Sequence, residues 1–265
     1  MYGSFKENFR RRAAALQGSL TKQMPYIAAF PQKGFLEMPF ITRRNMTKKK
    51  KTKVLIIYSI IFYALWAVME LIFKNAIDNA LKNEVITEFL KEVVIKNLLW
   101  TIPAIALIKY LKDDVYIPLK EMFSTKVNVL KYLPIFIIFT IFLLCNSFVL
   151  NGKITISESF GIDDIIIFIS EGLTEANVFR GLLVNVPLRA EKKWQGVEIN
   201  TLMFLAIHFP IWIHNGIFIT AFTGFSFVPI IILSIIFSWS FIKSRNILVP
   251  IALHTYWDLL LTMIS

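Results

Sequence analysis

The chain has 265 residues, of which 56% are hydrophobic and 18% are charged, and Phe alone contributes 24. A soluble domain cannot hide that much apolar surface from water, so the composition excludes a soluble globular protein and predicts one that lies in the bilayer. The net charge of +11 does not indicate nucleic-acid binding, because residues 1–53 hold 13 Lys and Arg against two acidic residues while the rest of the chain is balanced.

Residues 1–53 are expected to form a basic cytosolic arm, since residues 1–45 contain no apolar stretch long enough to cross a bilayer. The charge of this arm is expected to set the topology and to contact anionic membrane lipids. Met46 is followed by Thr47 and four lysines, and we expect the functional chain to begin there. The first apolar segment is too long for a signal peptide and should remain in the protein as an anchor.

Seven apolar segments follow, each close to the roughly 20 residues that a membrane-spanning helix needs. They cover residues 54–73, 93–111, 132–150, 165–186, 201–213, 228–242 and 247–264. The sequence therefore predicts an all-α, polytopic transmembrane bundle. Residues 54–150 would supply its first three helices, and residues 151–265 the helices that carry the chemistry described below.

The charges of the connections support this count. The basic connections alternate with connections that are acidic or uncharged, as the positive-inside rule demands of a protein with its N-terminus inside and its C-terminus outside. The basic ones are 48–53, 112–131, 187–200 and 243–246, and the others are 74–92, 151–164 and 214–226.

An ionisable side chain in the hydrocarbon region costs several kcal/mol unless it is paired or hydrated, so each one is a functional hypothesis. Glu70 and Lys96 lie near the ends of their predicted segments, where reaching out to the membrane interface is the simpler explanation. The fourth, fifth and seventh segments differ, because their ionisable groups lie deeper.

Glu171 and Glu175 are four residues apart on the fourth segment, and His254 and Asp258 have the same spacing on the seventh, so each pair shares a helix face. With a rise of about 1.5 Å per residue, Glu175, His208, His254 and Asp258 fall in one layer of the membrane, in its middle to cytosolic part. Hydrogen bonds that hold neighbouring helices together are the simplest role for any one of them. Together they predict a carboxylate beside an imidazole, the arrangement that activates water for hydrolysis, and a peptide bond is the natural target in a membrane.

Three stretches in chain order resemble the motifs of the CPBP (Abi) family, which includes CAAX-processing endopeptidases and bacterial proteins linked to bacteriocin maturation or self-immunity. The stretches are Glu175-Ala-Asn-Val-Phe-Arg180, Phe204-xxx-His208 and His254-xxx-Asp258. The family patterns are Glu-Glu-xxx-Arg, Phe-xxx-His and His-xxx-Asn or Asp on successive membrane helices. The resemblance covers about the last hundred residues.

This resemblance implies a role for each matching residue. Glu175 and His208 would activate the attacking water, and His254 and Asp258 would steady the tetrahedral oxyanion or hold the first pair in place. Phe204 would pack under the site. Two His and two carboxylates also match the ligands of zinc, so the resemblance leaves open whether Glu175, His208, His254 and Asp258 bind a divalent metal or no cofactor is needed.

Two further residues carry open questions. Glu171 would either line the same cavity one turn away or face the external headgroups. The second Glu of the family motif is Ala176 here, so Arg180 loses its expected partner one turn before it. Asp258 is a candidate replacement for that partner, and loss of catalysis with retention of the fold is the alternative.

The sequence thus predicts an intramembrane endopeptidase that hydrolyses a membrane-associated peptide or protein near the cytosolic face of a bacterial plasma membrane. A non-catalytic membrane protein of the same family, acting in bacteriocin self-immunity or as a scaffold, is the alternative. A proton-coupled transporter that uses the same buried carboxylates as a relay ranks last, because no internal repeat is seen.

Overall fold

A computed structural model describes residues 48–188 and 193–264. Chain contacts divide the protein into Met1–Arg44 and Asn45–Ser265, and the described residues all lie in the second unit. The predicted cytosolic arm, the candidate start at Met46 and all but residues 48–53 of the basic N-terminal segment therefore lie outside the described residues. Lys48–Lys53 form the first turns of a helix.

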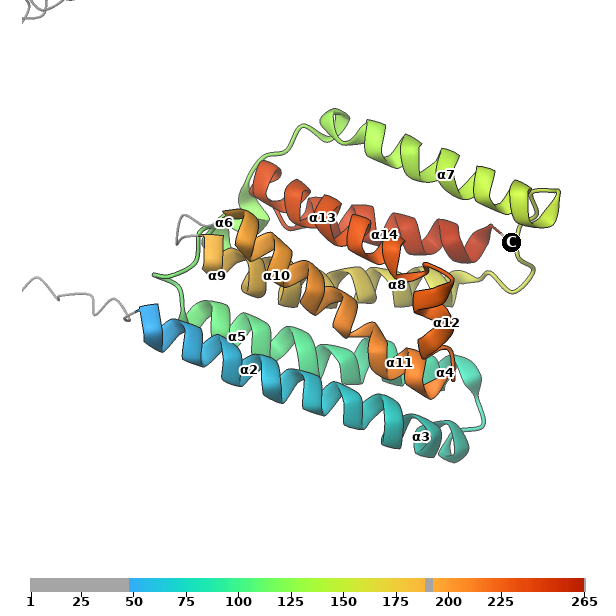
Figure 1. The fold of residues 1–265 in the computed structure, drawn as a ribbon, viewed down its shortest axis with the longest axis horizontal. Helices are drawn as coiled ribbons and strands as arrows, with labels where there is room; N and C mark the ends of the chain where they lie inside the picture. Colours follow the sequence, from blue (N-terminus) through green and yellow to red (C-terminus); the bar gives the residue numbers. More distant parts are fainter. Residues whose placement is uncertain (1–47, 189–192, 265) are drawn as a thin grey trace, which may run out of the picture. The chain divides into compact units, whose positions relative to one another are not determined.

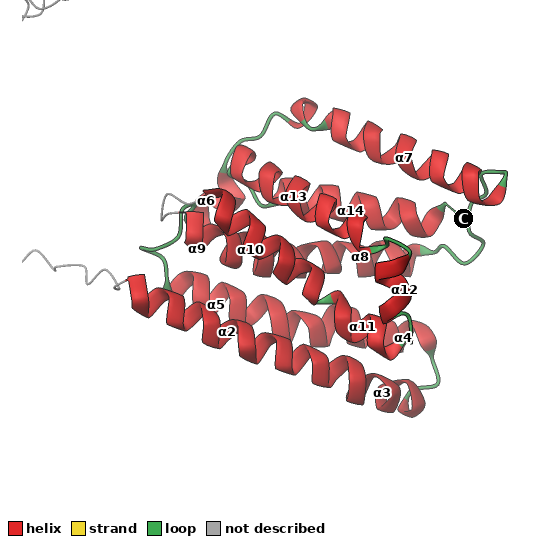
Figure 2. Ribbon diagram, viewed as in Figure 1, coloured by secondary structure: helices red, strands yellow, loops and turns green. Residues whose placement is uncertain are grey.

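The described residues form an all-α bundle, and the predicted fold class is confirmed (Figures 1 and 2). Apart from one isolated bridge between Ile156 and Ile264, this part of the chain contains no strand. Several consecutive elements form one continuous helix: α2, η1 and α3 form the first, the elements from α4 to α5 form another, and those from α8 to α9 form a third. The elements are α2 (Lys48–Val68), η1 (Met69–Phe73), α3 (Lys74–Ala80), α4 (Glu84–Glu88), η2 (Phe89–Ile95), η3 (Asn97–Thr101), α5 (Ile102–Tyr110), α6 (Leu119–Ser124), η4 (Val129–Lys131), α7 (Leu133–Asn151), α8 (Ile162–Glu175), η5 (Ala176–Val184), α9 (Asn185–Leu188), α10 (Lys193–Ala206), α11 (His208–His214), α12 (Phe218–Thr223), α13 (Phe227–Ser244) and α14 (Leu248–Met263).

Five of these helical segments are long and apolar enough to cross a membrane, and the protein is a multi-pass membrane protein. The five are Lys50–Ala80, Glu84–Tyr110, Leu133–Asn151, Trp194–His214 and Phe227–Ser244. The predicted fourth segment lies in a helix from Ile162 to Leu188 that carries five charged residues, and the predicted seventh is a shorter apolar helix, Leu248–Met263. The count of seven spans and their orientation stay predictions.

The long helix from Lys50 to Ala80 is called the first helix here, and the one from Glu84 to Tyr110, which runs from α4 to α5, is called the second helix. The second helix begins nine residues before its predicted segment of 93–111. The side chain of Asn83 accepts a hydrogen bond from the N–H of Ile86 at 3.0 Å, which caps the helix at Glu84. Its first turns carry charged residues that hydropathy alone assigns to a loop. These charges are paired: Lys91 Nζ lies 2.8 Å from Asp78 Oδ1 and 2.5 Å from Glu88 Oε1.

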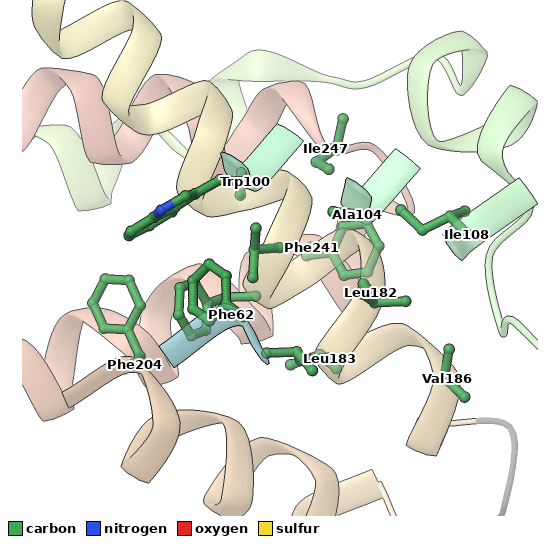
Figure 3. Packing of buried hydrophobic residues seen from close by; sticks show 14 of the residues in the cluster. Phe62, Trp100, Ala104, Ile108, Leu182, Leu183, Val186, Phe204, Phe241 and Ile247 are labelled. Carbon is green, nitrogen blue, oxygen red and sulfur yellow. The ribbon is translucent and has the colours of Figure 1, made fainter. Parts of the chain in front are cut away.

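The helix that runs from Ile162 to Leu188 lies at the centre of the bundle. All nine residues of η5 are buried, and η5 packs against α5, α10 and α13, while α8 packs against α14 and η2. Figure 3 shows part of the apolar core, to which α2 contributes Phe62, η3 contributes Trp100, and η5 contributes Leu182 and Leu183. The aromatic rings of Phe62 and Trp100 meet edge to face with their centroids 4.8 Å apart.

The fifth predicted segment is broken at Ile207, between α10 and α11. Pro210 has no N–H to donate to the carbonyl of Ala206, so the helix cannot continue unbroken there. The first helix also donates to the backbone on both sides of this break: Trp66 Nε1 donates to the carbonyl of Ile207 at 2.9 Å, and the Tyr63 hydroxyl donates to the carbonyl of Met203. These two hydrogen bonds tie the break to the first helix.

A connection at one end of the bundle is fixed by polar contacts. Arg245, which follows α13 in a left-handed conformation, donates from Nε to Glu121 Oε1 of α6 at 2.5 Å. This hydrogen bond holds the pKa of the Glu121 carboxyl below its usual value. The backbone N–H of Ile247 also donates to the carbonyl of Met122 at 2.8 Å, so the start of α14 is held against α6.

Helices α8 and α14 come close at Gly172. A Cβ atom placed there would lie 2.6 Å from Thr255 Oγ1 and 3.2 Å from the carbonyl oxygen of Ile251. The Thr255 hydroxyl donates to the carbonyl of Phe168 at 3.1 Å across the same contact. A small residue on one membrane helix thus lets the backbone of another approach, and this approach sets the distance between the polar residues of α8 and α14.

Gly172→Ala is expected to push α8 and α14 apart and to lower the free energy of unfolding by about 1–3 kcal/mol, the usual cost of overpacking. Thermal unfolding in detergent measures the loss. The double variant Gly172→Ala/Thr255→Ala removes the nearest clashing atom and should recover part of it. An equally large loss in both variants would show that the hydroxyl of Thr255 does not limit the approach.

Candidate active site

Glu175 ends α8 with its side chain in the interior of the bundle, and the local sequence explains why. Gly161 begins the helix, and its N–H donates to Asp164 Oδ2 at 2.8 Å, so the acidic residues lie at the positive end of the helix dipole. An apolar stretch follows and then the polar face of Ser170, Thr174 and Glu175, which are all buried. This polar face packs against α14 and η2.

Three of the predicted residues meet directly. His254 Nε2 lies 3.6 Å from Glu175 Oε2 and 3.2 Å from Asp258 Oδ2, so the imidazole stands between carboxylates from two helices. Both Glu175 and His254 are buried. Glu175 Oε2 has no hydrogen-bond partner among the described residues, which leaves it available as an acceptor.

His208 lines a cavity together with His254 and Asp258, but it does not contact Glu175. A cavity of about 480 Å³ between α7, α11, α13 and α14 is lined by His208, His254 and Asp258 among mostly apolar side chains. The described residues contain no hydrogen bond or ion pair between His208 and Glu175, although the resemblance pairs these two in water activation. The space between the two imidazoles and the acid is therefore where a water and a peptide would have to fit.

The tautomer of His208 follows from its backbone contact. His208 Nδ1 lies 3.0 Å from the carbonyl oxygen of Phe204. A carbonyl only accepts hydrogen bonds, so Nδ1 carries the proton and Nε2 of the neutral ring holds a lone pair. His208 is thus arranged as an acceptor, as a group that orients or deprotonates water must be.

Phe204 lies between the two imidazoles. Its ring centroid is 5.5 Å from that of His208 and 6.0 Å from that of His254, so Phe204 packs beside both rings. The ring of Phe237 lies 4.8 Å from His254 on another side. Aromatic side chains from α10 and α13 therefore restrict how both imidazoles can turn.

Arg180 is fully buried and lacks the carboxylate partner that the resemblance implies. None of its three side-chain nitrogens has a hydrogen-bond partner in the part of the chain that is described. The hypothesis that Asp258 replaces the missing Glu at position 176 is therefore wrong. The guanidinium lies instead over aromatic rings, 4.4 Å from the centroid of Phe204 and 5.2 Å from that of Phe237. Cation–π attraction partly offsets the cost of its burial.

Glu171 does not line the cavity, and it pairs with a lysine of another helix. Its Oε1 atom lies 2.8 Å from Lys96 Nζ, which comes from the second helix. Lys96 also lies 2.9 Å from Glu92 Oε2 and 4.0 Å from Glu175 Oε1, and it is 3% exposed. The prediction that Lys96 reaches out to the membrane interface is therefore wrong.

A pattern in the sequence could have revealed Lys96. Glu92, Lys96 and Trp100 are spaced four residues apart, so they lie on one helix face as an acid, a base and an aromatic ring. The pattern was hidden because the helix begins at Glu84, which places Lys96 well inside it rather than near its end. Glu70 is buried as well, and its Oε2 atom lies 3.2 Å from Lys74 Nζ.

The suggested metal-ligand set does not form. Within residues 48–188 and 193–264, no group of three or more His, Cys, Asp or Glu is arranged to hold a metal ion. An ammonium group, Lys96, already lies among the carboxylates of α8. The four residues do not fit a zinc site in this arrangement.

Arg180→Met is expected to leave the free energy of unfolding within about 1 kcal/mol of the native value or to raise it, because an apolar side chain replaces a buried charge that has no hydrogen bond. Lys96→Met should instead cost about 3–5 kcal/mol, the usual loss when one partner of a buried ion pair is removed. Thermal unfolding of both variants in detergent provides the comparison. A loss at Arg180 as large as that at Lys96 would mean that the guanidinium has an anionic partner.

Residues 159–260 match the family model described as type II CAAX prenyl endopeptidase Rce1-like. Neither the curated proteins nor the solved structures include a significant match. The matched residues contain all three motifs, with Glu175, His208 and His254 among them. The resemblance to the CPBP family is thereby confirmed for residues 159–260, which match the Rce1-like family of type II CAAX prenyl endopeptidases.

Proposed function

We propose that the protein is an intramembrane endopeptidase that hydrolyses a membrane-associated peptide or protein with a water activated by Glu175 and His208. The observation that carries this proposal is the Oε2 atom of Glu175, which has no hydrogen-bond partner among the described residues and lies 3.6 Å from Nε2 of His254, an imidazole that lines the same cavity as His208. The Rce1-like match supports a protease of the CAAX type at the level of the family.

The proposed reaction starts with a water held between the two groups. His208 Nε2 accepts one hydrogen bond from this water, and Glu175 takes its other proton as the water oxygen bonds to the peptide carbonyl carbon. The carbonyl oxygen becomes an oxyanion. When the carbon–nitrogen bond breaks, the leaving nitrogen takes the proton from Glu175, and the products are a carboxylic acid and an amine.

His254 and Asp258 are proposed to stabilise the oxyanion. An imidazole whose Nε2 lies between two carboxylate oxygens is favoured with a proton on that nitrogen, so it can donate to a third oxygen as negative charge develops there. Asp258, 3.2 Å away, would hold the ring in this orientation. Phe204 and Phe237 would keep both imidazoles from rotating.

The cavity is consistent with a substrate that has apolar side chains or a lipid-like portion. Its walls are mostly apolar, with Leu143, Leu233 and Trp257 among them, and its polar lining residues include the two imidazoles and Asp258. Cleavage near the cytosolic face of a bacterial plasma membrane is the expected setting. Membrane lipids and one membrane-associated polypeptide are the partners that this proposal requires.

A non-catalytic role is the second candidate, and one observation favours it. Ala176 replaces the second Glu of the motif, and Arg180 is left without a hydrogen bond. A protein of this kind would bind a bacteriocin-like peptide or a partner protease without cleaving it.

Glu175→Gln, His208→Ala and His254→Ala should each lower kcat for hydrolysis of a membrane-associated peptide by about 10²-fold or more, the usual contribution of acid–base groups. Purified protein in lipid vesicles and a lipidated fluorogenic peptide library provide the assay. Glu70→Gln and His214→Ala are matched controls, because both residues lie away from the cavity, and they should keep native activity. Full activity in Glu175→Gln would refute the proposal and leave the binding role.

Hydrolysis is also expected to persist after treatment with a strong divalent-metal chelator, since the described residues offer no arrangement of ligands for a metal. The same peptide assay, run before and after chelation and dialysis, measures this. Loss of activity that added zinc restores would contradict the expectation and assign the site to metal-assisted hydrolysis.

A further inference from the structure

The buried ion cluster around Lys96 lies next to the proposed site and joins it to the N-terminal half of the bundle. Lys96 Nζ lies 2.9 Å from Glu92 Oε2 on its own helix and 2.8 Å from Glu171 Oε1 on α8. Two of the three N–H bonds of the ammonium group are used in this way. Glu175 Oε1 lies 4.0 Å away, on the same side of α8 as Glu171.

Aromatic rings hold the ammonium group in this place. Lys96 Nζ lies 5.5 Å from the ring centroid of Trp66 and 5.1 Å from that of Trp100, which are both buried. Cation–π attraction is strongest for Trp and grows when the cation is removed from water. The neighbouring Asn97 donates to Ser170 Oγ at 2.8 Å, so the second helix and α8 cannot slide past each other without losing polar contacts.

The two oxygens of Glu175 face different partners. Oε1 faces Lys96, and Oε2 faces His254 at 3.6 Å. Glu171 and Glu175 are one turn apart on the same helix, where like charges repel, and Lys96 lies between them. A cation in this position stabilises the carboxylate at 175 in the orientation that presents Oε2 to the imidazole of His254.

We propose that Lys96 is a positioning residue for Glu175, so that the second helix completes a site whose other members all come from residues 159–260. This inference rests on the proposed function, because the step it assists is the one assigned to Glu175. Lys96 lies outside the family match, and its role follows from its contacts in this chain.

The decisive variant is Lys96→Met, which keeps the length of the side chain and removes its charge. We expect kcat to fall by about 10²-fold, the scale of the loss when a reacting group is misplaced by about 1 Å. KM should stay within about twofold, since Lys96 does not line the cavity. Lys96→Arg, which restores the charge, should recover part of kcat.

Lys91→Met is the matched control. Lys91 lies on the same helix, is also buried and also pairs with two carboxylates, those of Asp78 and Glu88. Replacing Lys91 should lower the free energy of unfolding but leave kcat within about twofold of the native value. A drop in kcat at both lysines would show that activity follows stability alone, and the positioning role would be wrong.

A second variant covers the case in which Lys96→Met does not fold. Lys96→Met/Glu171→Gln removes one charge of each sign, so that no partly buried carboxylate is left at position 171 without its ammonium partner. This variant should fold and still show the low kcat. Native kcat in it would overturn the inference.

The comparison with Glu175→Gln separates the two proposals. If Lys96 acts through Glu175, then Lys96→Met/Glu175→Gln should be no slower than Glu175→Gln alone. If Glu175→Gln is inactive while Lys96→Met is fully active, only the role of Lys96 is refuted. If Glu175→Gln is fully active, the peptidase proposal fails and the role of Lys96 fails with it.

Discussion

Charges buried within an apolar bundle must be paired, and this constraint organises the protein. The central helix brings Glu175 and Arg180 into the interior and leaves Glu171 partly buried, and an unpaired ion in such a place costs several kcal/mol. Lys96 from the second helix meets the two carboxylates, and His254 from α14 meets Glu175 on the other side. Arg180 is the exception, and it lies on aromatic rings instead of an anion. Charge pairing, as well as shape complementarity, therefore determines which side chains pack against the central helix.

The close contact of α8 with α14 turns this pairing into a candidate site. Because Gly172 has no side chain, the backbones approach until Thr255 bonds across the contact, and this sets His254 within 3.6 Å of Glu175. The helix break at Ile207 likewise positions His208, and the carbonyl of Phe204 fixes the orientation of its ring. Gly172, Pro210 and the backbone carbonyl of Phe204 thus determine the geometry around the cavity.

Much of the fold could be predicted from the sequence, because long apolar runs and paired polar residues are strong signals. The meeting of Glu175, His254 and Asp258 followed from helical spacing and equal depth. The start of the second helix was missed, because its charges look like a loop until Lys91 and Lys96 find their partners on other turns and helices. The supposed contact between Asp258 and Arg180 was wrong, since spacing along the chain cannot show how a side chain turns within a layer.

The capping of the carbonyl of Ile207 by Trp66 has a consequence for modularity. Residues 159–260 carry the family match, yet an indole from the first helix donates to the backbone at the helix break within them, and an ammonium from the second pairs with Glu171. Excised or transplanted onto other helices, that stretch would lose the indole donor of one carbonyl and the ammonium partner of one carboxylate. The two halves of this chain therefore cannot be exchanged independently of each other. Chimaeras between relatives should fail unless Trp66 and Lys96 are transferred together with residues 159–260.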